Sequence, residues 1–100
     1  MPGIKYTVVL QPEELGYSVT CPAVPGAVSQ GDSMDEALRN IQDAVQGILA
    51  GLKEDGRKVP QEKPDPVAAE VRVILKERAE DGLPLTIETR EIEVEAGVLV

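Results

Sequence analysis

The side chains best suited to chemistry gather in one short acidic segment, where Asp32, Asp35 and Glu36 fall within five residues. Paired carboxylates of this kind bind Mg²⁺ or act as general acid and base. The sequence contains no histidine, which excludes Ser-His-Asp and Cys-His arrangements and removes the commonest metal ligand. Helix capping and turn formation account for the same three acids. We therefore predict no enzyme activity, no metal site and no cofactor.

Cys21 is the only cysteine, so no internal disulfide forms. It lies in an alternating apolar segment, which favours a buried small side chain over the alternative of a reactive thiol. The N-terminal residues lack the pattern of a signal peptide, and no apolar run approaches the roughly 20 residues that span a bilayer. These features predict a cytoplasmic protein without a membrane segment.

The chain is acidic, with 18 Asp and Glu against 10 Lys and Arg and a net charge of −8. This charge disfavours direct binding of nucleic acid and favours basic protein partners, although ordinary solubility is an equally good explanation. An acidic stripe near the C-terminus comprises Glu88, Glu91, Glu93 and Glu95. It is either a solvated face that guards a sheet edge or a docking edge for a basic protein.

The first thirty residues predict three short strands. Apolar and polar residues alternate over 4–10 and again over 17–21, and residues 11–16 form the expected turn of an antiparallel hairpin. A corner follows, because Pro22 and Pro25 cannot donate ladder hydrogen bonds and Gly26 permits a tight turn. Residues 27–30 give the third strand.

A long amphipathic helix is predicted from about Met34 to about Asp55. Ser33 and Glu36 form a capping box, in which the Ser33 hydroxyl accepts from the Glu36 amide and the Glu36 carboxylate accepts from the Ser33 amide. Gly56 provides the stop signal. The apolar stripe recurs at spacings of three and four, through Ala37, Leu38, Ile41, Ala44, Val45, Ile48, Leu49 and Leu52.

Gly47 and Gly51 lie inside this helix one turn apart, and each costs about 1 kcal/mol relative to alanine. Two explanations stay open. Another backbone approaches the helix closely at this point, or the helix tolerates both glycines near its end.

The remaining segments are an extended proline-rich connector over 57–66, a helix over 67–81 and a strand region over 84–95. The helix is preferred over a strand at 70–75, where apolar residues also alternate. Leu85 and Ile87 fall in the opposite phase to Ile92 and Val94, which predicts a bulge or break near 89–91.

The segment from Pro22 to Val45 resembles the signature of the HicB-like antitoxin family, in which a pattern like PDLPGC-x-S-x-GDT-x-EEA leads into a helix. Together with the upstream strands, the resemblance covers about half of the chain. Ala27 stands where the family often has cysteine. The matching residues are Pro22, Pro25, Gly26, Ser29, Gly31, Asp32, Ser33, Glu36, Ala37 and Ala44.

The resemblance implies a partial RNase H-like fold and a partner, a basic HicA-like toxin that cleaves mRNA and is silenced by being covered. Many family members also carry a C-terminal DNA-binding segment, but residues 67–100 are acidic and show no helix-turn-helix pattern. The alternatives are an operator-binding regulator that uses Arg72, Lys76 and Arg78 in an oligomer, and a relative that has no toxin.

We therefore predict an α+β fold: an antiparallel three-stranded sheet with a long helix on one face, then a shorter helix and a C-terminal strand. Residues 1–56 form the HicB-like core and 57–66 the connector, and 67–100 complete the same domain or an oligomer interface. A dimer or tetramer is expected, because a small core and exposed sheet edges favour association.

Overall fold

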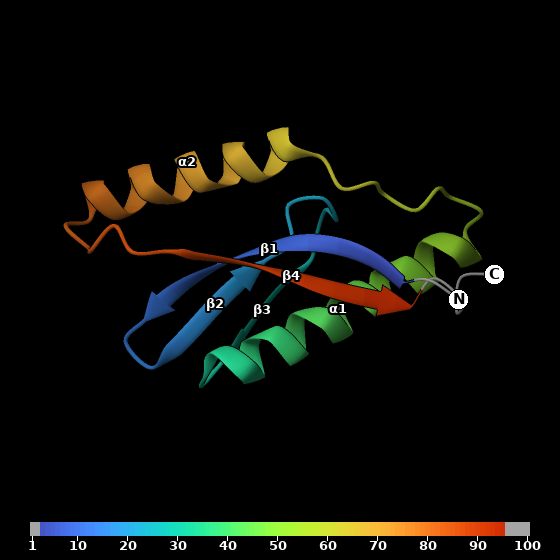
Figure 1. Cartoon of the computed structure of the whole chain (residues 1–100), viewed down its shortest axis with the longest axis horizontal. Helices are drawn as coiled ribbons and strands as arrows, with labels where there is room; N and C mark the ends of the chain where they lie inside the picture. The colour runs from blue at the N-terminus through green and yellow to red at the C-terminus, as the bar shows by residue number, and fades with distance from the viewer. Residues whose placement is uncertain (1–2, 96–100) are drawn as a thin grey trace.

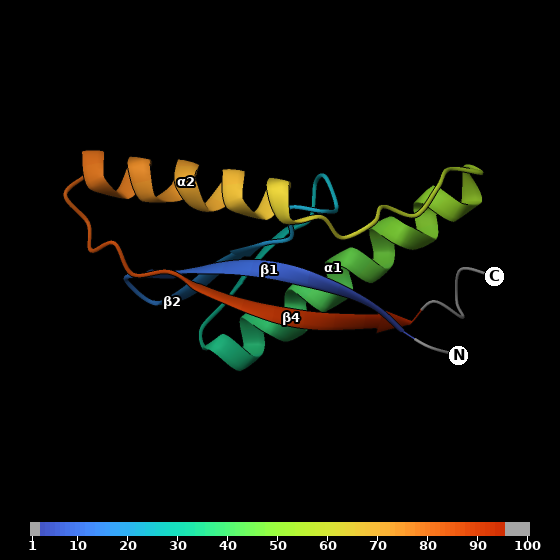
Figure 2. The same cartoon turned by 45° about the horizontal axis from the view of Figure 1, so that its top comes forward.

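A four-stranded antiparallel sheet forms the middle layer of the protein, with one helix on each side of it (Figure 1, Figure 2). The computed structural model describes residues 3–95. Its strands lie in the order β3-β2-β1-β4. The elements are β1 (Gly3–Glu13), β2 (Gly16–Thr20), β3 (Val28–Gly31), α1 (Met34–Glu54), α2 (Pro64–Glu80) and β4 (Glu88–Glu95).

The predicted α+β class is confirmed, but the sheet has four strands where three were expected. The C-terminal strand β4 pairs antiparallel with β1 from Gly3↔Glu95 to Leu10↔Glu88. The β1–β2 hairpin is also longer than predicted, because β1 runs to Glu13 and Pro12 pairs with Tyr17. Pro12 is tolerated there because β4 has already left β1 at Leu10, so one side of β1 is an edge at that point.

The main core lies between the sheet and α1. Alternate residues of β1, namely Tyr6, Val8 and Leu10, are fully buried on this side. The helix contributes its buried stripe of Ala37, Ile41, Val45 and Leu49. The prediction of a long helix on one face of the sheet is therefore confirmed.

The second face of the sheet is covered by α2, which contacts β1. Val9 lies between Val8 and Leu10 in β1, so its side chain points to the face opposite the main core. It is buried there and is not part of the main core cluster. The buried apolar residue of α2 is Ile74. This layer is thinner than the first, since α2 buries only Ile74 and Arg78.

Local signals set the bounds of α1. The Ser33 hydroxyl accepts a hydrogen bond from the Glu36 amide, as predicted. The Glu36 carboxylate, however, accepts from the amide of Asp32 and not from that of Ser33. The helix ends at Glu54 with Asp55 as its C-cap, and Gly56 follows with a φ of +71°, which favours glycine and allows the Arg57 amide to donate to the Leu52 carbonyl.

The segment after α1 is mostly exposed, as predicted, but it is hydrogen-bonded to β1. β2 pairs with β1 only from Val9 onward, and the Thr7 amide beside that gap donates to the Glu62 carboxylate. The Tyr6 hydroxyl donates to the Pro60 carbonyl. The chain then enters α2 at Pro64, three residues before the predicted start at Val67, and no side chain caps this end.

Residues 67–80 are helical, so the helix preferred over the rival strand is observed. The bulge predicted near 89–91 is absent, because the pairing of β4 with β1 is unbroken from Glu88 to Glu95. Leu85 and Ile87 precede β4, which begins at Glu88. Their alternation therefore need not match that of Ile92 and Val94 inside the strand. Of the C-terminal segment 67–100, the last five residues lie outside the described part.

Both sheet edges are bonded to polar side chains of α1, which crosses the sheet from the β3 edge to the β4 edge (Figure 1). At the β3 edge, the Asn40 amide donates to the Gln30 carbonyl. At the β4 edge, Gln42 donates to the Glu93 carbonyl, and Gln46 bonds both backbone groups of Glu95. The argument that exposed edges drive association is thereby weakened, and the predicted dimer or tetramer stays a prediction.

The two glycines inside α1 face open space, since a Cβ built on Gly47 or Gly51 meets no described atom within 4 Å. Close approach of another backbone within residues 3–95 is therefore ruled out. We expect Gly47→Ala to raise the free energy of unfolding by about 0.5–1 kcal/mol, because alanine loses less backbone entropy in a helix. Urea unfolding measures this, with Gly56→Ala as the destabilised control. A loss of stability in Gly47→Ala would contradict the expectation.

Candidate functional site

The turn between β3 and α1 holds the sheet and the helix in close contact. A Cβ added to Gly31 would overlap the Ala37 amide nitrogen and lie 2.8 Å from the Ala37 Cα. Ala37 itself is fully buried. These two motif residues are therefore small for a steric reason, and they fix where the helix begins on the sheet.

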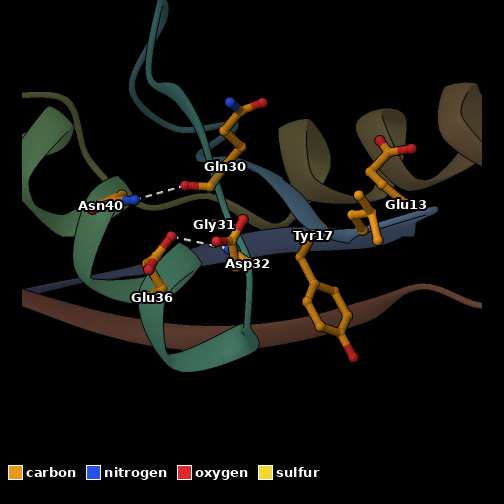
Figure 3. A pocket seen from close by; sticks show the side chains of 8 residues that line it. Glu13, Tyr17, Gln30, Gly31, Asp32, Glu36 and Asn40 are labelled. Atoms are coloured by element: carbon orange, nitrogen blue, oxygen red, sulfur yellow. Dashed lines mark hydrogen bonds between the residues drawn. The ribbon is translucent and has the colours of Figure 1, made fainter.

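The acidic residues of the same turn serve the backbone. The Glu36 carboxylate accepts from the Asp32 amide at 3.0 Å, and Asp35 and Glu36 lie in the first helical turn, where negative charge is favoured (Figure 3). No group of three or more histidine, cysteine, aspartate or glutamate residues within 3–95 is arranged to hold a metal ion. The site therefore offers binding surface and charge.

The proline-glycine corner before β3 is a closed loop. The Cys21 amide donates to the Ala27 carbonyl at 3.0 Å, and Val24 and Ala27 make two further backbone bonds inside it. Gly26 has a φ of +89°, which glycine adopts without strain. Pro22 and Pro25 precede the two turning points, so this part of the motif also shapes the backbone.

A cavity of about 260 Å³ opens beside this turn (Figure 3). It brings the N-terminal turn of α1 together with the tip of the β1–β2 hairpin. Its lining residues are Glu13, Leu15, Tyr17, Gln30, Gly31, Asp32, Glu36 and Asn40. Three carboxylates and one exposed leucine therefore share a single hollow.

A second cavity, of about 530 Å³, lies on the other side of the hairpin tip, between Pro12–Glu14 and the segment after α2. Arg78 lines it and is only 5% exposed. Its guanidinium donates to the carbonyls of Pro84 and Pro12 and to the side-chain oxygen of Gln11. Arg78 therefore ties the segment after α2 to the end of β1.

The predicted acidic stripe is divided by the sheet. Glu91, Glu93 and Glu95 pair with Thr7, Lys5 and Gly3 on the face that carries Val9. Glu88 points to the opposite face and forms an ion pair with Arg90 at 2.9 Å. The three remaining glutamates are exposed and do not reach the hairpin cavities.

Cys21 is a buried free cysteine, as the preferred prediction had it. Burial raises the pKa of its thiol to about 11, and the nearby negative charge of Glu62 adds to this shift, while backbone bonds from Val24 and Ala23 oppose it. Tyr6 is buried beside it, and its pKa is also raised, mainly by burial. A thiol of this kind stays protonated and unreactive at neutral pH.

Sequence reasoning missed the residues at the hairpin end, the end of the molecule where the tip of the β1–β2 hairpin lies beside the segment after α2. Leu15 was assigned only to a turn, yet a leucine between Glu14 and Gly16 at a hairpin tip is an exposed apolar side chain by necessity. Arg78 was interpreted as a surface charge, and its burial depends on β1 and the segment after α2. The motif residues Gly31, Asp32 and Glu36 are the only predicted ones at this place.

Comparison with known proteins assigns the chain to a family. Residues 6–76 match the family model described as the HicB-like antitoxin of bacterial toxin-antitoxin systems. The chain belongs to the HicB-like antitoxin family. A UPF0150 protein of Thermoplasma acidophilum is 37% identical over 65 residues, which cover 64% of this chain and 94% of that protein.

Longer antitoxins contain the same HicB-like unit. Antitoxin HicB 1 of Photorhabdus laumondii is 41% identical over 59 residues, which are 58% of this chain but only 38% of that protein. The crystal structure of the Burkholderia pseudomallei antitoxin HicB has the same fold, with a TM-score of 0.69 and 22% identity over 97% of this chain and 67% of that one.

A chain in the solved HicA3 and HicB3 toxin-antitoxin complex also shares the HicB-like fold, with a TM-score of 0.60 and 14% identity. The match covers 92% of this chain and 99% of that one. Neither helix of the described part of this HicB-like chain is long and apolar enough to cross a membrane.

Replacement of Gly31 tests the close contact that places α1. We expect Gly31→Ala to lower the free energy of unfolding by about 1–3 kcal/mol, because the new methyl group must displace the helix backbone. Gly47→Ala makes the same chemical change in open space and is the matched control. Equal stability of the two variants in urea unfolding would show that β3 and α1 are not held this closely.

The buried thiol predicts a loss of stability in alkali. Its pKa is higher in the folded chain, so the native state holds the proton to higher pH and stability falls as pH rises from about 9 towards about 11. Unfolding midpoints at pH 8, 9 and 10 should fall more steeply in the wild type than in Cys21→Ala. Tyr6 contributes in both proteins at the upper end. Identical slopes would contradict the assignment.

Proposed function

We propose that this protein is an antitoxin that binds a HicA-like toxin and covers its RNA-cleaving surface. The observation that carries the proposal is the family match over residues 6–76. The net charge of −8 suits a basic partner, because opposite charges raise the association rate and select the partner. The solved HicA3 and HicB3 complex contains a chain of the same fold.

We further propose that inhibition is steric and needs no catalysis by this chain. The sequence lacks histidine, and the carboxylate of Glu36 is used at the start of α1. A covering protein needs a surface that matches its partner in shape and charge, and the candidates are the cavity at the hairpin tip and the glutamates on the face of β4. Glu91, Glu93 and Glu95 are kept as one candidate docking surface, whereas Glu88 is paired with Arg90.

The operator-binding alternative loses its structural support. It required a basic surface that included Arg72, Lys76 and Arg78, but Arg78 is buried and bonded to carbonyl groups. The cluster therefore supplies at most two accessible cations from α2, which is little for binding a phosphate backbone.

Co-expression with a HicA-like toxin tests the antitoxin proposal, and any small basic protein encoded beside this gene is the first candidate. We expect this chain to rescue growth and to co-purify with the toxin. The affinity should weaken severalfold as salt rises from about 0.05 to about 0.5 M, because screening reduces attraction between opposite charges. An unrelated antitoxin of similar net charge is the control. Absence of both rescue and complex would reject the proposal.

A further inference from the structure

Exposed apolar side chains gather at one end of the molecule. Five large ones are exposed within residues 3–95, and three of these belong to the hairpin tip and to the segment after α2. Leu15 is 87% exposed, Leu85 59% and Leu83 46%. Both segments line the larger cavity, and Leu15 lines the smaller one. Exposed apolar side chains that gather at one end of a soluble protein favour an interaction site there.

Carboxylates surround these leucines. Glu13 borders both cavities, Glu14 borders the larger one, and Asp32 and Glu36 border the smaller one. Arg78 is the only basic residue that lines either cavity, and its charge is directed to the carbonyls of Pro12 and Pro84. The end is therefore both apolar and negative, which suits a basic partner and repels a second copy of this acidic chain.

The end is also rigid before any partner arrives. Arg78 joins the segment after α2 to β1 through Pro84 and Pro12. The Leu83 amide donates to the Arg78 carbonyl at 2.8 Å, and the φ of +71° at Gly82 makes this turn possible. Ser18 donates to Glu13 across the hairpin at 2.8 Å. A surface fixed in advance loses little conformational entropy on binding.

We propose that this hairpin end, formed by Leu15, Leu83 and Leu85 with Glu13, Glu14 and Asp32, is the surface that anchors the toxin. The partner presents apolar side chains to the leucines and Lys or Arg to the carboxylates. The inference rests on the proposed antitoxin function and adds the place of contact. The glutamates on the face of β4 are the rival surface, and they lack exposed apolar neighbours within their own strand.

Binding kinetics with matched variants test the surface, with a catalytically inactive HicA-like toxin as probe. We expect Leu15→Ser with Leu85→Ser to weaken affinity about tenfold or more, mainly through faster dissociation. Val73→Ser is the control, since Val73 is 51% exposed on α2. Wild-type affinity in the double variant, with toxin bound, would overturn the surface and leave the antitoxin function intact.

Charge reversal supplies an independent readout. Glu14→Lys should slow association in a salt-dependent manner, because charges at the rim of an interface act mainly on the encounter. Glu54→Lys reverses an equally exposed glutamate at the far end of α1, the opposite end of the molecule (Figure 1), and should have a much smaller effect. Equal effects would show that only net charge matters and would reject the proposed location.

Hydrogen exchange on the unaltered protein covers the case of a variant that folds poorly. Addition of the toxin should protect backbone amides of residues 13–17 and 82–86. Protection confined to Glu91, Glu93 and Glu95 would assign the partner to the rival surface. Loss of a self-association equilibrium in the leucine variant, without loss of toxin binding, would assign the leucines to a second copy. A wild type that binds no toxin would reject the function and the surface together.

Discussion

The diagonal packing of α1 on the sheet is the contact on which the other features depend. One stripe of Ala37, Ile41, Val45 and Leu49 closes the core, and it does so only because Gly31 lets the start of the helix touch β3. Since the helix crosses from one sheet edge to the other, its polar flanks reach both edges. Asn40 bonds β3, and Gln42 and Gln46 bond β4. The same contact places Asp32 and Glu36 beside the hairpin tip.

The proposed function of covering another surface agrees with the state of two groups that could otherwise react. The Cys21 thiol is buried and its pKa raised, and the Glu36 carboxylate holds the backbone at the start of α1. The exposed surface offers charged side chains and a few leucines, namely Leu15, Leu83 and Leu85. A buried guanidinium is costly unless its hydrogen bonds are met, and Arg78 meets this need with oxygens from β1 and from the segment after α2. Its burial thus makes the hairpin end one surface.

Most of the motif residues shape the backbone, and only Asp32 belongs also to the proposed docking surface. Pro22, Pro25, Gly26, Gly31 and Ala37 shape the backbone, as their torsion angles and contacts show. The sequence motif could therefore predict the family and the path of the chain. It could not predict the burial of Arg78, because the guanidinium bonds Gln11 and Pro12, which lie more than sixty residues away in sequence.

Short-range chemistry written in the sequence determined the helices, their glycine stops, the Ser33 cap and the family, because each depends on residues within a few positions of one another. Only the tertiary structure decided that β4 lies beside β1, that Glu88 parts from the other three glutamates, and that Arg78 is buried. Strand pairing and the burial of a charge depend on which distant segments meet. The packing of the whole chain decides which segments meet, and a local pattern of residues cannot predict it.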